Sequence, residues 1–184
     1  MVTARMRTLS HAEARRVYDR IGARQDSQAF YEDAALAVLL RHGEFAAARA
    51  VFELGCGTGR VAERLLDAHL PADARYRGVD LSPTMVALAG RRLARFGERA
   101  QVALSDGPPA QPDAAASYDR FLSTYVLDLL SDADIAAVLG EAHCLLRPGG
   151  LLCLTSLSTG SGPGSRLMAR LWSAIHGLAP ALVG

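Results

Sequence analysis

The sequence predicts an α/β fold in which a doubly wound, mainly parallel sheet carries helices on both faces. From Ala50 onward, short apolar runs alternate with amphipathic segments, and a glycine-rich turn, GCGTG at 55–59, follows the first run. Strands joined by helical crossovers form parallel sheets that are covered on both faces. The 184 residues are enough for one domain with a substantial core.

Two helices are expected before the sheet. Residues 10–22 begin with Ser10 and Glu13 at the spacing of a capping box, and residues 26–41 have an apolar side and stop before Gly43. We assign residues 1–49 to an N-terminal helical lid or cap and residues 50–184 to the α/β domain.

Five strands are expected, at 50–54, 76–80, 100–105, 118–126 and 151–157. Three helices are expected between them, ending at Leu66, ending at Phe96 and covering 131–146. Ser82 before Pro83, and Ser131, are typical of helix N-caps. Pro148-Gly149-Gly150 indicates a turn before the fifth strand.

The composition excludes several classes of protein. A formal charge of +1 gives no field that would gather nucleic acid or an anionic membrane. Three cysteines without CxxC spacing do not indicate a disulfide framework or a zinc site, and the scattered histidines do not indicate a metal. No signal peptide and no long apolar segment is seen. We therefore expect a cytoplasmic protein with no metal, no nucleic-acid partner and no integral membrane association.

The glycine turn lies where a doubly wound sheet binds its ligand, at the carboxyl end of the first strand. A dinucleotide fingerprint would have glycine at position 60, where this chain has Arg60, and a phosphate-binding P-loop would need a Lys that is absent after Gly59. This glycine spacing disfavours an NAD(P)-dependent oxidoreductase, which stays as an alternative interpretation.

Five segments resemble, in order and spacing, the class I S-adenosylmethionine-dependent methyltransferases: ELGCGTG (53–59), GVDLSPTMVALA (78–89), LSDGPP (104–109), YDRFLSTYVLDLL (118–130) and LRPGGLLCLTS (146–156). The resemblance covers about residues 50–157. The segments ARRVYDRIG and LSPTM are most similar to the small-molecule branch, which methylates quinone precursors, phospholipid head groups and secondary metabolites. The resemblance implies a Rossmann-like sheet with strand order 3-2-1-4-5.

The resemblance also implies where the methyl donor would lie. The turn would admit its methionine and ribose portions against bare backbone, over Gly55, Cys56, Gly57, Thr58 and Gly59. Cys56 itself would only fill a small space beside the glycines.

Two carboxylates are implied to bind the donor. Glu53 would lie beneath its methionine portion, or would instead cap backbone amides at the strand end. Asp80 would accept hydrogen bonds from the ribose hydroxyls, which needs two acceptor oxygens, or would cap the turn at Ser82.

The adenine would lie beside the second and third strands. Leu81 and Met85 are implied to pack on its faces, although both fit equally as core residues. Asp106, between Ser105 and Gly107, is implied to accept from the adenine amino group, with a simple Asx-turn as the alternative.

The acceptor side is implied to follow the fourth strand, where Ser123, Thr124 and Tyr125 could touch both donor and acceptor. Tyr18 is implied to close over the donor as part of the lid, with an ordinary half-buried tyrosine on an amphipathic helix as the alternative. Methyl transfer from a sulfonium is an in-line displacement that depends mainly on orientation. If the acceptor must lose a proton, the candidate bases are Tyr18, Tyr125 and Asp128.

The predicted activity is therefore transfer of a methyl group from S-adenosylmethionine to a small-molecule acceptor, leaving S-adenosylhomocysteine. A non-catalytic module that only binds S-adenosylmethionine stays as a second alternative.

The C-terminal part of the sequence departs from the family pattern. Residues 158–165 are rich in glycine and serine, residues 167–178 have helical spacing, and no run typical of a sixth or seventh strand follows Ile175. The fifth strand would then be an open edge, which proteins rarely leave uncovered. We expect either a truncated chain or a homodimer in which a second copy covers this edge.

Overall fold

The computed structural model describes residues 11–22, 29–107 and 115–156. The predicted glycine-rich segment at 158–165, the helical spacing at 167–178 and the question of a sixth and seventh strand lie outside these residues. No helix in the described part of the chain is both long and apolar enough to cross a lipid bilayer.

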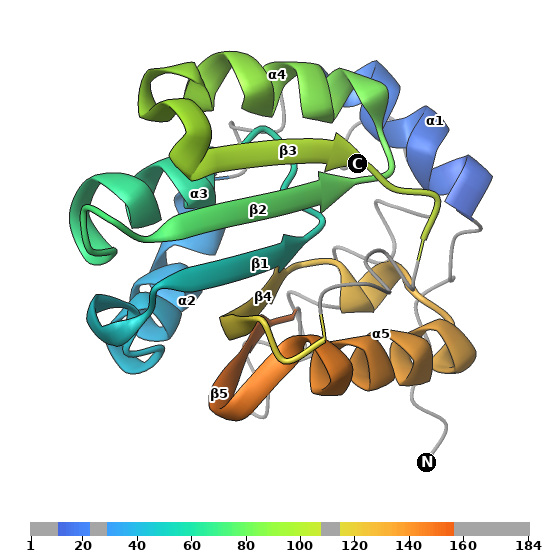
Figure 1. Ribbon diagram of the computed structural model, residues 1–184. Coiled ribbons are helices and arrows are strands. Elements are labelled where there is room, and N and C mark those ends of the chain that lie inside the picture. The colour runs from blue at the N-terminus through green and yellow to red at the C-terminus, as the bar shows by residue number, and fades with distance from the viewer. Residues whose placement is uncertain (1–10, 23–28, 108–114, 157–184) are drawn as a thin grey trace.

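The centre of the molecule is a five-stranded sheet with the order β3-β2-β1-β4-β5 (Figure 1). The strands are β1 (Ala50–Leu54), β2 (Arg75–Asp80), β3 (Ala100–Leu104), β4 (Tyr118–Thr124) and β5 (Leu146–Thr155). Every pairing is parallel, so the carboxyl ends of the strands lie at one edge. The predicted fold class and strand order are confirmed.

The helices occupy both faces and the carboxyl edge of this sheet. They are α1 (His11–Ile21), α2 (Ala29–His42), α3 (Arg60–Arg64), α4 (Pro83–Leu93) and α5 (Asp132–Leu145). The helix expected to end at Leu66 continues beyond α3 as a π-helical turn, Leu65–His69. A 3₁₀ segment, Ala94–Arg99, follows α4.

Serine side chains begin two of these helices, as the sequence predicts. Ser82 Oγ accepts a hydrogen bond from Met85 N at 3.2 Å at the start of α4, and Ser131 Oγ accepts one from Asp134 N at 3.1 Å at the start of α5. Each bond satisfies one of the backbone N–H groups that have no partner inside the helix. The α4 helix therefore starts just beyond the carboxyl end of β2.

The strand β5 begins at Leu146 rather than at Leu151. The predicted turn, Pro148-Gly149-Gly150, lies inside it as an irregularity: between the pairs Tyr118–Leu146 and Arg120–Leu151 the register shifts. Gly149 has φ of 81°, a conformation that glycine adopts at little cost. The prolyl-glycyl segment therefore interrupts the pairing without ending the strand.

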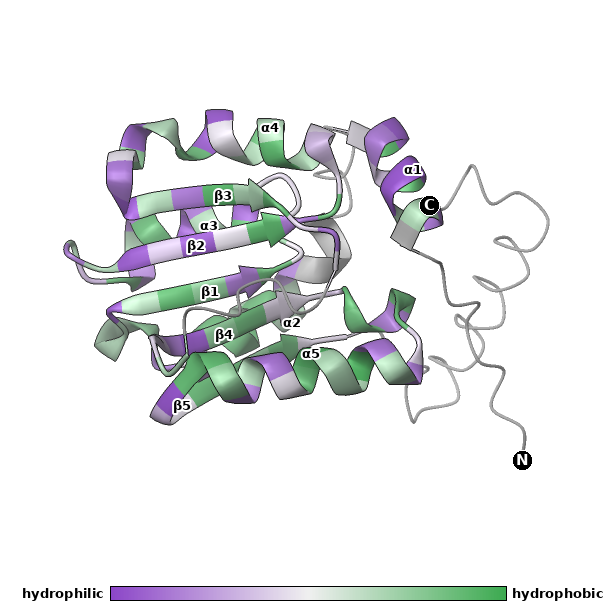
Figure 2. Ribbon diagram, turned by 45° about the vertical axis from the view of Figure 1, so that its right-hand side comes forward, coloured by the Kyte–Doolittle hydropathy of each residue, from purple (hydrophilic) through white to green (hydrophobic). Residues whose placement is uncertain are grey.

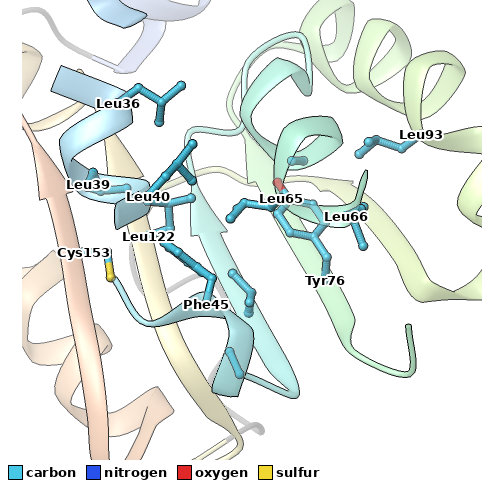
Figure 3. Packing of buried hydrophobic residues seen from close by; sticks show 13 residues of the cluster. Leu36, Leu39, Leu40, Phe45, Leu65, Leu66, Tyr76, Leu93, Leu122 and Cys153 are labelled. Carbon is cyan, nitrogen blue, oxygen red and sulfur yellow. The ribbon is translucent and has the colours of Figure 1, made fainter. Parts of the chain in front are cut away.

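Two apolar clusters hold the helices to the two faces, because successive side chains of a strand point to opposite faces. On one face, α2 and the π-helical turn pack residues such as Leu40 and Leu65 against Tyr76 and Leu122 (Figure 3). The other cluster joins β1 and β4 to α5 and contains Phe52, Phe121, Val138, Ala142 and Leu145. Figure 2 shows hydrophobic residues along β1 and in the middle of β4, between these helices.

The segment after α2 is fastened to the sheet by Arg120 of β4. Its Nε donates to Gly43 O at 2.5 Å and its guanidinium also donates to Glu44 O at 2.8 Å. Through these bonds and its leucines, α2 belongs to the same core as the strands. The division at residue 50 into a lid and a sheet domain stays a prediction.

Candidate functional site

The glycine turn between β1 and α3 is fixed to the end of β2. Gly55 N and Cys56 N both donate to Val79 O, at 2.8 Å and 3.0 Å, and Gly59 N donates to Cys56 O at 2.9 Å. Arg92 of α4 donates to both the carbonyl and the hydroxyl oxygen of Thr58, at 3.1 Å and 2.8 Å. The turn is thus held from two sides, by the end of β2 and by α4.

Gly57 and Gly59 have different physical reasons for being glycine. Both have positive φ, 52° and 78°. A Cβ on Gly59 would lie 3.1 Å from Ala89 of α4, so this glycine lets α3 and α4 approach. A Cβ on Gly57 would meet no atom of the described residues within 4 Å. Gly57 is therefore the point at which the turn presents bare backbone to open space.

Gly55 connects the turn to the segment after β4. A Cβ at this position would overlap the side chain of Val126. Nearby, Ser123 Oγ of β4 donates to Leu54 O at the end of β1, at 3.0 Å. The loops after β1 and β4 therefore pack directly on one another, and Ser123 is buried between them.

Asp80, the last residue of β2, reaches back to the glycine turn. One carboxylate oxygen accepts from Gly57 N and the other from Ser82 N, both at 2.9 Å. Burial raises the pKa of Asp80; the two N–H groups oppose this rise, and the charge of Asp19 adds to it. A carboxylate offers about four lone-pair sites, so each oxygen can still accept a bond from a ribose hydroxyl.

Glu53, near the end of β1, is completely buried. Its Oε2 accepts a hydrogen bond from the Tyr76 hydroxyl at 2.5 Å, and its Oε1 is buried with no hydrogen-bond partner among the described residues. Burial raises the pKa of this carboxyl to about 8, although the Tyr76 hydroxyl lowers it; the charge of Asp80 raises it further. A buried oxygen without a partner costs stability and is unusual unless a ligand or water satisfies it.

Cys56 lies inside the same cluster and has no feature of a nucleophile. Its side chain is buried, and burial, followed by the charges of Glu53 and Asp80, raises the pKa of its thiol well above the ordinary value. Because the thiolate is the reactive form, this environment keeps the thiol inert.

The residues predicted around the adenine come from two segments, one that follows β2 and one that follows β3. Met85 is fully buried, as in a core position, whereas Leu81 is only half-buried. Ser105 N donates to Asp80 O at 2.9 Å, which places the predicted adenine segment beside the ribose carboxylate. Asp106 is exposed at this edge.

The predicted base candidates lie on different elements. Tyr125 directly follows β4 with φ of 57°, a strained value for a non-glycine residue, and Asp128 accepts a hydrogen bond from Ser156 beyond the end of β5. Tyr18 is on α1, which packs against α4 at the carboxyl edge (Figure 1). Next to it, Asp19 accepts from Ser82 Oγ at 2.5 Å.

Three residues at the site were not predicted from the sequence. Tyr76 and Arg92 donate hydrogen bonds to predicted site residues, Glu53 and Thr58 respectively. Asp19 instead accepts one from Ser82, the N-cap of α4.

Only Tyr76 has a signal in the sequence, the glycine two positions later. A Cβ at Gly78 would lie 2.5 Å from the Tyr76 hydroxyl oxygen and 2.8 Å from Cys56 Cβ. Glycine inside a strand often marks such a close approach.

The model of a methyltransferase-domain family matches residues 51–150, more than half of the chain. The chain belongs to this family. The match contains the glycine turn, Asp80 and all of β4.

Two curated relatives have comparable identity to this methyltransferase-family chain. Trans-aconitate 2-methyltransferase of Methylobacterium radiotolerans is 34% identical over 153 residues, which are 80% of this chain and 55% of that protein. Carboxy-S-adenosyl-L-methionine synthase of Chromohalobacter salexigens is 34% identical over 116 residues, 62% of this chain and 42% of that protein. The chain thus spans about half the length of these relatives.

Among solved structures, the DhpI–SAH complex has the same fold. Its TM-score is 0.62 at 21% identity, and the similarity covers 90% of this chain and 88% of that one. At this identity the likeness establishes the architecture of the methyltransferase family.

Proposed function

We propose that the chain transfers a methyl group from S-adenosylmethionine to a small-molecule acceptor. One observation carries the proposal: the carboxylate of Asp80 holds the amide of Gly57 at the point where the turn has bare backbone. This arrangement leaves carboxylate lone pairs beside open space, which suits a ribose diol.

The residues present fit this donor. It is a sulfonium without a pyrophosphate, so it needs close backbone approach and anionic surroundings rather than a phosphate cradle. Glu53 and Asp80 supply two carboxyl groups, and Glu53 Oε1 has no partner among the described residues. The register of the glycines and the family membership both disfavour the alternative of a nicotinamide-dependent oxidoreductase.

When bound, the donor supplies an activated methyl group whose carbon–sulfur bond breaks as the acceptor attacks. The chain's own part is to orient the reactants, which can contribute about 7–11 kcal/mol in well-aligned cases. Asp80 would hold the ribose and Asp106, with Ser105 and Gly107, would read the adenine. Tyr18, Tyr125 and Asp128 are the candidates to take a proton from the acceptor.

A titration of thermal stability tests donor binding. S-adenosylmethionine is expected to raise the melting temperature, because a ligand at about 100 times its dissociation constant adds about 2.7 kcal/mol of stability. NADH at the same concentration should leave it unchanged. The reverse result would overturn the proposal in favour of the oxidoreductase.

An acceptor screen coupled to release of S-adenosylhomocysteine tests turnover. Because a relative is named for methylating trans-aconitate, small carboxylic acids are the first acceptors to try. Sustained release of S-adenosylhomocysteine supports the enzyme, whereas donor binding without turnover on any acceptor supports a non-catalytic module.

The remaining parts of the proposal concern partners and location. We propose a cytoplasmic protein that binds no nucleic acid, since its net charge is +1. We also propose a homodimer that covers the edge of β5, which is the outer strand at one end of the described sheet. Residues 1–49 are proposed to include the lid, with α1 as the helix at the carboxyl edge.

A further inference from the structure

Glu53 is a buried acid that pairs with the Tyr76 hydroxyl. If its carboxyl were ionised, nothing in the described structure would balance the negative charge. Glu53 is completely buried, and its carboxyl receives one hydrogen bond, from the Tyr76 hydroxyl to Oε2 at 2.5 Å. Oε1 is left without a partner among the described residues. An ionised carboxyl in such a place is costly unless an opposite charge comes near.

The groups that face Glu53 do not provide this opposite charge. Tyr76 and Asp80 come from β2 and Cys56 from the glycine turn, and all of them are neutral or acidic. On α1, Asp19 faces Asp80 and is also an acid.

Among the described residues of the neighbouring elements, the nearby cations have partners of their own. Arg92 of α4, beside the turn, donates to the carbonyl and hydroxyl oxygens of Thr58. Arg120 of β4 lies two positions from Glu53 in the sheet register, but its guanidinium donates to the carbonyl oxygens of Gly43 and Glu44.

On α3, Arg60 and Arg64 pair with Asp33 of α2. The apolar Ala62 of α3 belongs to the cluster around Tyr76. Leu65 of the π-helical turn belongs to it too (Figure 3). A neutral, protonated Glu53 is the form that these surroundings favour.

We propose that Glu53 is a proton-linked counter-ion of the methyl donor: it carries a proton in the unliganded protein and releases it when the cationic donor binds. Tyr76 is the positioning residue, because its hydroxyl occupies Oε2 and leaves Oε1 as the oxygen that is protonated or ionised. This inference rests on the proposed function, since it takes S-adenosylmethionine as the ligand of the adjacent turn.

The proton balance of this step is simple. The O–H bond at Oε1 breaks, its electron pair stays on the carboxylate, and the proton passes to water. The donor brings a sulfonium and an ammonium group over the turn, and a nearby positive charge favours the ionised carboxyl even without direct contact. In the unliganded protein the pKa of Glu53 is about 8, so the proton is present at neutral pH.

Calorimetric titration of the full chain with S-adenosylmethionine tests the linkage. In wild-type protein the affinity should rise by up to about tenfold per pH unit from about pH 6 toward the pKa of Glu53, and binding at pH 7 in buffers of different ionisation heat should report release of about one proton. Adenosine, which lacks both cationic groups, should release none.

Three variants make the result specific. Glu53→Gln should remove the proton release, and since the donor's amino group and Asp80 titrate in both proteins, the difference isolates Glu53. Tyr76→Phe removes the hydroxyl that lowers the pKa of Glu53, so the rise in affinity should move to higher pH. Tyr118→Phe should match wild type, because this half-buried tyrosine lies at the amino end of β4 and contacts Phe52 edge-to-face.

The outcomes separate the two proposals. Donor binding with equal pH dependence and equal proton release in wild type and Glu53→Gln would overturn the linkage alone. An unchanged profile in a folded Tyr76→Phe variant would overturn the positioning role of Tyr76. Absence of donor binding at every pH would overturn the proposed function, and the linkage with it.

Discussion

Asp80 joins the glycine turn to the start of α4, because its carboxylate accepts from Gly57 N and from Ser82 N. Replacing it by Asn leaves an NH₂ group facing one of two backbone N–H donors, so one hydrogen bond is lost and the charge with it. We expect Asp80→Asn to weaken S-adenosylmethionine binding by at least about tenfold, since a hydrogen bond to a charged group contributes about 1.5–3 kcal/mol.

The chain offers a matched control for this measurement. Asp119 also accepts two backbone hydrogen bonds, from Arg49 N and Ala50 N at 2.7 Å and 2.9 Å, but at the amino ends of β1 and β4. Asp119→Asn should lower stability while the donor dissociation constant in a calorimetric titration stays near the wild-type value. Equal loss of donor affinity in both variants would mean that Asp80 acts only through stability.

Glu53 should also make the stability of the unliganded protein depend on pH. Its pKa is raised from an ordinary 4.5 to about 8 in the folded protein, so the folded state holds a proton that the unfolded state has lost. This contribution is fully present below about pH 4.5 and is lost as pH rises through about 8.

Urea unfolding of wild type and Glu53→Gln at about pH 6 and pH 8, without donor, tests this pH dependence. Between these values the free energy of unfolding of wild type should fall by about 2 kcal/mol relative to the variant, since one pKa unit corresponds to about 1.4 kcal/mol. If the free energy of unfolding changes equally with pH in the two proteins, the Glu53 carboxyl is already ionised in the folded state.

At the scale of elements, the start of α4 has two functions. Ser82 caps the helix through Met85 N and also donates to Asp19 of α1. We expect Ser82→Ala to cost about 1 kcal/mol of stability, as for other lost N-caps, and to lower the hydrogen-exchange protection of α1.

Ser131→Ala provides the comparison, because Ser131 caps α5 in the same way and is far from α1 in the sequence. It should cost a similar free energy of unfolding and leave the exchange of α1 unchanged. If both variants alter α1 equally, the contact between Asp19 and Ser82 does not hold that helix in place.

The elements that the sequence predicted well are those whose signal is local. The strands contain short apolar stretches, such as Ala50–Phe52 in β1, and the caps at Ser82 and Ser131 depend on residues only three positions apart. The start of β5 was placed too late because Pro148-Gly149-Gly150 has the composition of a turn, whereas its place in the strand depends on pairing with β4.

The site residues, too, were predictable only where their signal is local in the sequence. The family resemblance pointed to the turn, Glu53 and Asp80, but the partner of Glu53 could not be read from the chain. Tyr76 meets Glu53 only because β1 and β2 pair with Glu53 opposite Gly78, and register between strands is a property of the folded sheet. The contact between Asp19 and Ser82, 63 positions apart, has the same origin.

At the scale of the whole molecule, the sheet has two outer strands in its described part, β3 and β5. Leu152 of β5 is 41% exposed and Leu104 of β3 is 48% exposed. If a second copy covers β5, Leu152→Glu should convert a dimer into a monomer in analytical ultracentrifugation, because a buried unpaired charge is costly. Leu104→Glu, at the opposite edge, should leave the dimer intact, and a wild-type monomer at high concentration would contradict the dimer.

The close approach of Val126 to Gly55 limits which substitutions the protein can accept near the turn. Any side chain at position 55 would displace Val126, so the turn for the donor and the segment proposed to face the acceptor cannot be redesigned separately. Libraries that aim at new acceptor scope should therefore vary Thr124 and Tyr125 and keep Val126. Substitutions at 126 larger than valine are expected to reduce donor affinity as a side effect of any gain in substrate range.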